Sequence, residues 1–352
     1  MIPEQWRTVA LAPPTAWGGA LGSGLLRSSP EDFIVDEMLG FAASGDGPHA
    51  LLRVRKRGAN TEWVARELAR AVGCKPFEVG FAGLKDRNAL TTQTFTVPRG
   101  KRPAEEFAGL KGEGYEVIEA AAHQRKLPRG ALEGNRFDIT VRELRADPAQ
   151  VAQRLAAIAG GGVPNYFGPQ RFGREAGNLE AVMRAAAALG QGGRRGRAPD
   201  QGFMLSAARG LVFNAVLAER VRQGSWNRLS PGDVANLDGR GSVFAVELPD
   251  AGLERRCAEM DLHPTAALPG AGEPLARGAA LELEQAIAAQ FPEAMAVIQS
   301  ERMNAERRAL RLRVRDLSWE YRDEMLRLQF ALSAGSFATA VLREIIGSVA
   351  EE

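Results

Sequence analysis

The chain has 352 residues, of which 45% are hydrophobic and 25% are charged. This is the composition of an ordinary globular protein, and the length favours two domains over one. No apolar run approaches the ~18 residues of a membrane span. The N-terminus also lacks the basic and then apolar pattern of a secretory signal. We therefore expect a protein that neither crosses a membrane nor is exported.

Cysteines and histidines are few and scattered. Cys74 and Cys257 are two isolated thiols, which are typical of buried side chains in the reducing cytoplasm rather than of a disulfide framework. His49, His123 and His263 show no metal-binding spacing with them. The sequence therefore predicts a cytoplasmic protein without a zinc site.

Charge is distributed unevenly along the chain. Residues 51–200 carry 26 Lys and Arg against 16 Asp and Glu, a local charge of +10, whereas the whole chain carries only +2. A basic region in a nearly neutral chain indicates a surface that meets an anion, and nucleic acid is the commonest large one. The alternative is an ordinary solvated charged face.

The first half of the chain shows mainly strand patterns. The first 25 residues are rich in Gly, Pro and Ala and predict an irregular lead-in. Thr61 is the expected N-cap of a helix whose apolar face carries Val64, Leu68 and Val72. Alternation and flanking turn residues predict strands over residues 33–37, 49–56, 91–97, 115–118 and 137–141.

A helix is expected to begin after Asp147 and to end at the three glycines of residues 160–162, the best candidate for a domain boundary. Beyond it, residues 206–223 predict a helix and residues 191–197 a mobile basic loop. Strand alternation returns at residues 310–315 and 326–330, and Ser336 is the expected cap of a final helix with Phe337, Val341 and Ile345 on one face. Either three units follow in series, or a middle domain is inserted into a core built from both ends.

Residues 80–87 (GFAGLKDR) form the segment with the clearest chemical potential. This glycine-rich turn between two predicted strands should present its side chains at a strand end. Lys85 and Arg87 flank Asp86, and two adjacent cations keep a carboxylate ionised, as a carboxylate nucleophile requires. The same cations could contact a phosphate. The alternative is a solvated charge cluster in a surface turn.

Two further segments combine basic and aromatic residues. Residues 123–130 place cations before Asn135 and Phe137, where they could grip phosphates while the ring stacks on a base. The alternative is a polar hairpin in which Phe137 belongs to the core. Residues 163–173 contain three rings that could stack on nucleotides or pin two domains together. These rings belong to Tyr166, Phe167 and Phe172.

Eight motifs in this order resemble the TruD family of tRNA pseudouridine synthases. The most specific are the turn Gly83-Leu84-Lys85-Asp86-Arg87 and the segment Asn165-Tyr166-Phe167-Gly168-x-Gln170-Arg171-Phe172-Gly173. The others are Phe33-x-Val35-x-Glu37, Gly47-Pro48-His49, Asn60-Thr61, Gly130-x-Leu132-x-Gly134-Asn135-x-Phe137, Ser206-Ala207-Ala208-Arg209 and Ala334-Gly335-Ser336-Phe337-Ala338-Thr339. Together they cover nearly the whole chain.

The resemblance implies an α+β fold. A pseudouridine-synthase-like catalytic domain with a largely antiparallel sheet would be interrupted by a family-specific inserted domain. The catalytic domain would comprise residues 1–159 and 308–352, and the insertion residues 160–307.

The resemblance also implies that Asp86 is the catalytic nucleophile. Five residues map onto the substrate-binding site: Phe33, Lys85, Asn135, Phe137 and Phe337. The expected reaction is isomerisation of uridine 13 in the D arm of tRNA, after the base is flipped out of its stack. No cofactor, membrane or obligate protein partner is expected, and we expect a monomer.

Two other functions remain as alternatives. A non-catalytic protein that binds or remodels tRNA on the same fold would bind without turnover. A methyltransferase would need a cofactor, usually held by a glycine-rich loop between a strand and a helix, and the sequence offers no such loop.

Overall fold

The structure is a computed structural model that describes residues 2–191, 201–301 and 303–351. It divides into two compact units. We call Ala20–Leu155, Val314–Ala338 and Ile345–Glu352 the sheet unit, and Met1–Gly19, Ala156–Arg313 and Thr339–Glu344 the helical unit. Both units contain helices and sheets, so the predicted α+β class is confirmed. Apart from Gln191, the predicted basic loop at residues 191–197 lies outside the described residues.

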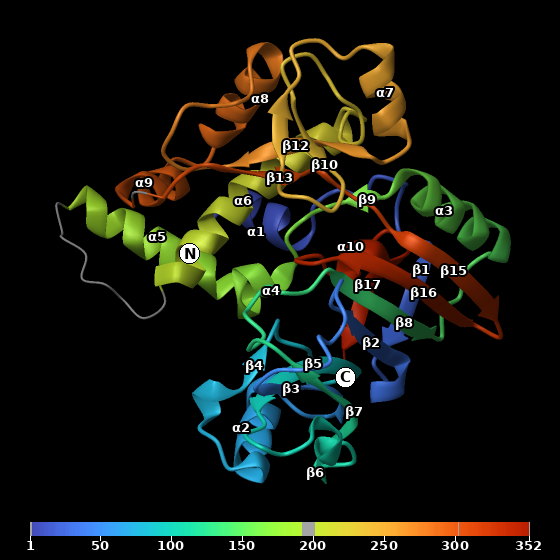
Figure 1. Cartoon of the computed structure of the whole chain (residues 1–352). Coiled ribbons are helices and arrows are strands. Elements are labelled where there is room, and N and C mark those ends of the chain that lie inside the picture. The colour runs from blue at the N-terminus through green and yellow to red at the C-terminus, as the bar shows by residue number, and fades with distance from the viewer. Residues whose placement is uncertain (1, 192–200, 302, 352) are drawn as a thin grey trace. The chain divides into compact units, whose positions relative to one another are not determined.

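An 11-stranded sheet organises the sheet unit (Figure 1). Its main path runs β15-β16-β8-β2-β5-β3-β7-β6, and β1, β4 and β17 pair beside this path. The strands are β1 (Gly22–Leu26), β2 (Phe33–Met38), β3 (His49–Arg57), β4 (Gly80–Phe81), β5 (Leu90–Pro98), β6 (Lys111–Gly112), β7 (Tyr115–His123), β8 (Gly134–Arg142), β15 (Arg315–Arg322), β16 (Met325–Ser333) and β17 (Ile346–Glu351). The sheet is largely antiparallel, because β2–β5 and β1–β17 are the parallel pairs among the strands described.

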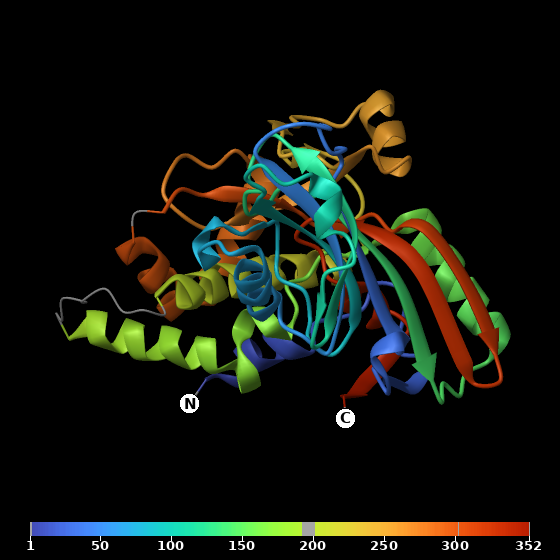
Figure 2. The ribbon, with the colours of Figure 1, turned by 60° about the horizontal axis from the view of Figure 1, so that its bottom comes forward.

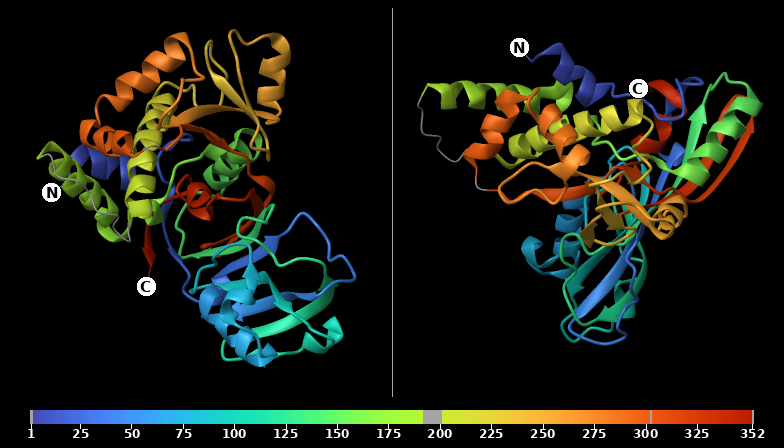
Figure 3. Two further views of the ribbon diagram at one scale, coloured as in Figure 1. Left: turned by 60° about the vertical axis from the view of Figure 1, so that its left-hand side comes forward. Right: turned by 90° about the horizontal axis from the view of Figure 1, so that it is seen from above.

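Apolar and charged residues alternate along the strands, and this alternation determines which face of the sheet is covered by other elements. In β3, Leu52 and Val54 are buried while Arg53 and Arg55 are exposed. Helix α2 (Thr61–Val72) contributes its apolar stripe to the same core cluster as β3 and β5, and it lies beside these strands in the left view of Figure 3. Figure 2 shows the long strands β8, β15 and β16 side by side. Short 3-10 turns complete the unit: η1 (Pro30–Asp32), η2 (Pro76–Glu78) and η3 (Ala104–Phe107).

The N-cap of α2 is Asn60, so the prediction that Thr61 caps this helix is wrong. Thr61 is the first helical residue, and its hydroxyl is used elsewhere. It donates to the side-chain oxygen of Gln93 and accepts from the backbone N–H of Lys85. The helix start is thereby tied to the turn that carries Asp86.

The helical unit packs around α6 (Gln201–Arg222), which is buried on almost every side. The other helices are α1 (Glu4–Leu11), α4 (Pro169–Phe172), η4 (Arg174–Ala176), α5 (Gly177–Gly190), α7 (Ala251–Ala258), α8 (Gly278–Ala288), α9 (Pro292–Ser300) and α10 (Ala338–Leu342). The strands are β9 (Val163–Pro164), β10 (Val234–Leu237), β11 (Val243–Ala245), β12 (Leu262–Leu268), β13 (Glu306–Ala309) and β14 (Arg311–Leu312). Helix α3 (Pro148–Gly161) has the predicted cap, because the Asp147 carboxylate accepts from the Ala149 N–H.

Three predictions for the ends of the chain are wrong. The irregular lead-in contains α1 and β1. The strand predicted at residues 310–315 is broken between β14 and β15, and Arg311 within it is buried and donates to carbonyl oxygens of Cys257 and Leu262. The final helix is only α10, since the chain then enters β17, which pairs with β1.

Candidate active site

Asp86 lies in the irregular turn between β4 and β5 of the sheet unit. Its side chain is 58% exposed, so the carboxylate is open to a substrate. Oδ2 accepts a hydrogen bond from Nη2 of Arg27 at 2.8 Å. The turn therefore presents a carboxylate paired with one arginine, at the surface rather than in an interior ion pair.

Arg27 is a site residue that the sequence analysis missed. It follows β1 directly, and its guanidinium lies 4.3 Å from the centre of the Phe33 ring as well as against Asp86. The backbone of Arg27 has φ 60°, a left-handed conformation that non-glycine residues seldom adopt and that often marks a functional site. No sequence motif flagged Arg27, because it follows the stretch that the composition assigned to an irregular lead-in.

Phe33 and Phe137 are brought together by the pairing of β2 with β8. Their rings meet edge to face, with centroids 6.3 Å apart, and Phe137 stacks on Phe330 of β16 at 5.3 Å. All three rings are buried. They form an aromatic floor, and Arg27 covers it at Phe33. Sequence analysis also missed Phe330, because its position in the alternating pattern of β16 is that of an ordinary core residue.

Lys85 turns inward instead of toward solvent. Its ammonium group lies 2.8 Å from Oε2 of Glu37, and both side chains are almost fully buried. Oε1 of Glu37 accepts from the backbone N–H of Thr94 at 3.1 Å. Lys85 therefore braces the turn against β2, and its ammonium group is not presented to a phosphate in this arrangement.

Asn135 lies opposite Glu37 in the β2–β8 pair and opposite Leu332 in the β16–β8 pair. Its side-chain oxygen is buried and has no hydrogen-bond partner among the described residues. An unpaired buried acceptor is costly, so it is typical of a position that a ligand donor completes.

Phe337 lies four residues beyond Ser333, the end of β16, which pairs with Gly134 next to Asn135. Phe337 is 37% exposed as a whole residue, in contrast to the buried residues of the aromatic floor. Side-chain contacts and strand register thus link five of the six predicted site residues to one another. Phe337 is linked to them only by its position in the sequence, shortly after β16.

A groove with a volume of about 690 Å³ lies beside the turn that carries Asp86. We call it the basic groove; it is lined by Arg57, Gly58, Ala59, Asn60, Trp63, Arg66, Arg87, Glu113 and Gly114. Arg87 follows Asp86 directly, so one wall of the groove is continuous with the turn. Arg57 pairs with Glu31, which holds the pKa of that carboxyl below its ordinary value, whereas no ion pair joins Arg66 to another described residue. An anion with aromatic bases suits this lining.

The other basic and aromatic segments have structural roles. Within residues 123–130, Arg129 packs on the Phe81 ring at 3.6 Å. In residues 163–173 the three rings are buried in the core of the helical unit, so the interpretation that they stack on nucleotides is wrong. Arg171 and Arg308 cover the Phe167 ring there. Among the described residues, no cluster of His, Cys, Asp or Glu is arranged to hold a metal ion, and no helix could span a membrane.

Comparison with known proteins shows the class of protein to which this chain belongs. A family model described as tRNA pseudouridine synthase D (TruD) matches residues 18–186 and 201–345. The tRNA pseudouridine synthase D of Methylococcus capsulatus is 43% identical over 95% of this chain and 94% of that protein. Its namesake from Xanthomonas campestris is 44% identical over 94% of both chains. The crystal structure of a putative tRNA pseudouridine synthase D from Methanosarcina mazei shares the fold, with a TM-score of 0.74, 21% identity and 99% coverage of both chains.

These relatives are tRNA pseudouridine synthases, isomerases that act on tRNA. The chain belongs to the TruD family of these enzymes. The predicted family and enzyme class are therefore confirmed.

Proposed function

We propose that this chain converts uridine 13 in the D arm of tRNA to pseudouridine, with Asp86 as the nucleophile and without a cofactor. The observation that carries the proposal is the exposed carboxylate of Asp86, held by Arg27 beside the aromatic floor. Family membership supports the reaction and the tRNA substrate. The resemblance in the motifs supports the position in tRNA.

The reaction replaces the bond between N1 of uracil and the anomeric carbon of the sugar by a bond from carbon 5 of uracil to the same sugar carbon. An oxygen of Asp86 attacks the anomeric carbon as the N1 glycosidic bond breaks, or it adds to carbon 6 of the ring and the N1 glycosidic bond breaks afterwards. The uracil then turns and bonds to the anomeric carbon through carbon 5, Asp86 is released, carbon 5 loses its proton and N1 gains one. Arg27 orients the carboxylate until the attack, because its guanidinium donates a hydrogen bond to Oδ2 of Asp86.

The remaining site residues hold the base during this rotation. Phe337, the exposed ring, stacks on the flipped uracil, and Phe33 and Phe137 form the apolar surface beneath it. The unpaired side-chain oxygen of Asn135 accepts from the N3–H of uracil. Flipping costs a few kcal/mol, and phosphate contacts in the basic groove offset it. Retention of the detached base prevents an abasic tRNA.

We further propose that the sheet unit is the core of the catalytic domain, residues 1–159 and 308–352, and that residues 160–307 are the inserted domain. The sheet unit is itself assembled from separate stretches of the chain, with β15 and β16 completing a sheet begun by the N-terminal half. A monomer acting in the cytoplasm fits this arrangement.

Replacement of Asp86 by Asn tests the proposal. Asp86→Asn should abolish pseudouridine formation, because an amide is a poor nucleophile, and tRNA affinity should stay within about threefold of the unchanged protein. Tritium release from unmodified tRNA labelled at carbon 5 of uridine measures turnover, and filter binding measures affinity. Asp323→Asn, at a highly exposed aspartate of the same unit, is the matched control.

Full turnover by Asp86→Asn would remove this residue from the mechanism. Binding of tRNA without turnover by the unchanged protein would favour the alternative, a non-catalytic tRNA-binding protein. Mapping the product determines whether position 13 is the target.

A further inference from the structure

Lys56, in β3, lies beneath the turn that carries Asp86. It is the only lysine among the described residues that is buried as a whole residue, with 1% of its surface exposed. Lysine is seldom buried, because its ammonium group loses hydration. Burial lowers the pKa of Lys56 to about 8, although the nearby charge of Asp86 opposes this shift and that of Lys85 adds to it.

The ammonium group of Lys56 ends among backbone oxygens. Its Nζ lies 3.0 Å from the carbonyl oxygen of Ala59, 3.0 Å from that of Asp86 and 3.4 Å from that of Lys85. Three acceptors match the three N–H donors of an ammonium group. The contacts therefore join the end of β3 to the two peptide groups that flank Asp86.

Other contacts hold the turn at other atoms, among them the buried Lys85–Glu37 ion pair and a hydrogen bond from the Gly130 N–H to the carbonyl oxygen of Ala82. Residues 82–89 belong to no helix or strand. The turn is held chiefly by side chains: Gln93 donates to the carbonyl oxygen of Gly83, and Thr61 accepts from the N–H of Lys85. Lys56 supplies the contacts to the carbonyl oxygens of Lys85 and Asp86. Without the contacts from Lys56, the carbonyl groups of Lys85 and Asp86 would be free to rotate. The side chain of Asp86, which bears the carboxylate, would then move with them.

We propose that Lys56 is a positioning residue, which orients the Asp86 carboxylate by fixing the carbonyl groups of Lys85 and Asp86. It does not touch the reacting atoms. A purely stabilising role accounts less well for these contacts, because a buried ammonium group bonded only to neutral carbonyls is costly and an apolar side chain of similar volume would pack there more cheaply. The inference rests on the proposed nucleophilic role of Asp86.

Lys56→Met removes all three donors and keeps most of the side-chain volume. We expect its single-turnover rate to fall about 100-fold, since misplacement of a catalytic group by about 1 Å has effects of this size. The affinity for tRNA should stay within about threefold. Hydrogen exchange of a peptide covering residues 82–90 should become faster, because the turn loses its anchor.

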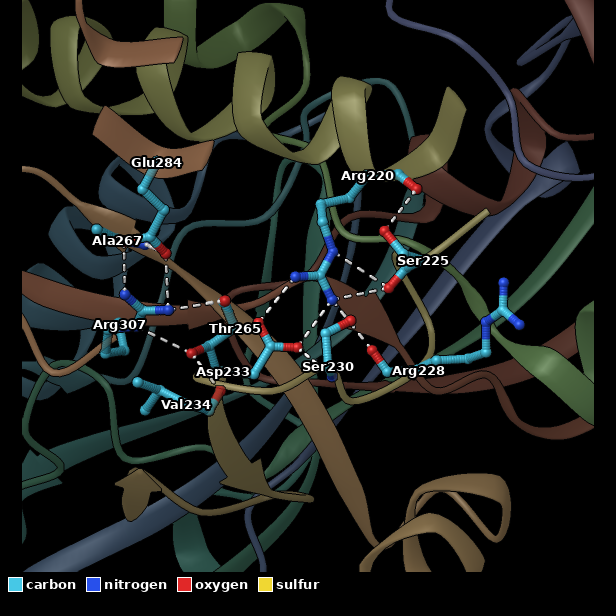
Figure 4. A network of polar contacts seen from close by, with 10 residues as sticks. All are labelled: Arg220, Ser225, Arg228, Ser230, Asp233, Val234, Thr265, Ala267, Glu284 and Arg307. Atoms are coloured by element: carbon cyan, nitrogen blue, oxygen red, sulfur yellow. Dashed lines mark hydrogen bonds and ion pairs between the residues drawn. The ribbon is translucent and has the colours of Figure 1, made fainter. Parts of the chain in front are cut away.

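A matched control separates positioning from stability. Arg220 of α6 is another buried cation that donates to backbone carbonyls, those of Ser225 and Arg228, and it pairs with Asp233 (Figure 4). Arg220→Met should lower the melting temperature at least as much as Lys56→Met, yet it should keep the turnover rate of the folded protein within about threefold. Both variants are assayed well below their melting temperatures.

A folded Lys56→Met protein with unchanged turnover or unchanged exchange in residues 82–90 would overturn the inference. An equal loss of turnover in Arg220→Met would also overturn it. If Lys56→Met fails to fold, Lys56→Gln, which keeps two donors, decides by the same measurements: a rate about tenfold lower supports positioning, and an unchanged rate refutes it. Asp86→Asn is assayed in parallel, because turnover by that variant would refute the proposed function itself rather than the role of Lys56.

Discussion

Arg27 is the residue whose importance only the structure reveals. Its guanidinium contacts the Asp86 carboxylate on one side and the Phe33 ring on the other. Arg27→Met should lower the single-turnover rate about 100-fold, equivalent to about 2.7 kcal/mol in the activation barrier, because the carboxylate loses the cation that orients it. Rapid-quench assays at saturating enzyme measure this rate.

Two companion variants sharpen that experiment. Arg27→Lys keeps a positive charge within reach of Asp86 and should recover much of the loss. Arg145→Met removes a largely exposed arginine paired with Glu324 in the same unit, and it should leave the rate unchanged. Wild-type turnover by Arg27→Met would show that Asp86 needs no cation beside it.

At the scale of elements, β2 is anchored at its N-terminal end by Asp32 of η1. Asp32 is 2% exposed, and its carboxylate accepts three hydrogen bonds from Arg142 of β8 and one from the Ser29 N–H. The hydrogen bonds from Arg142 are the main cause that lowers the pKa of Asp32 from its ordinary value of 3.8. This end of β2 bears Phe33, so the anchor supports the aromatic floor.

Asp32→Asn should lower the free energy of unfolding at pH 7 by about 2 kcal/mol, because it removes charge-assisted hydrogen bonds. Since the folded-state pKa is depressed, this stabilisation is fully present above pH 3.8 and is lost as the pH falls through the folded-state pKa. Urea unfolding at pH 7 and at a series of values below 4 should therefore show the difference between the two proteins shrinking. Asp323→Asn is the exposed control, and a difference that stays constant with pH would contradict this account.

Most elements of the sheet could be predicted, because alternation is a local signal. Strands β2, β3, β5 and β16 begin and end within a few residues of the predicted bounds. The failures arise where partners distant in sequence decide the outcome. The chain after α10 forms a strand because it pairs with β1. Arg311 is buried because backbone carbonyl oxygens accept hydrogen bonds from its guanidinium group.

The same distinction applies to the candidate site. Motifs predicted Asp86, Phe33 and Asn135, which strand register and contacts then link. Arg27 and Lys56 were not singled out, because a lone cation in a strand or loop carries no spacing signal, and Glu37 belonged to a motif but had no predicted role. Only the fold places them against the turn.

At the scale of the whole molecule, the uneven charge along the sequence has a structural counterpart in the basic groove. Its arginines come from β3, α2 and the turn, so residues from separate stretches of the 51–200 region gather there. Arg66 is exposed and has no ion-pair partner among the described residues, which leaves its charge available to a phosphate. Trp63 beside it offers a ring for a base.

Arg66→Gln should therefore weaken tRNA binding without changing turnover at saturating tRNA. If Arg66 contacts one phosphate, the slope of log affinity against log salt concentration should fall by about one. Arg322→Gln is a control, because Arg322 is also a surface arginine but lies on β15, an end strand that β16, β8, β2 and β5 separate from β3 in the strand order. Filter binding at several salt concentrations distinguishes the two variants. An unchanged slope for Arg66→Gln, or an equal loss in both, would exclude the basic groove as the place where the tRNA backbone is held.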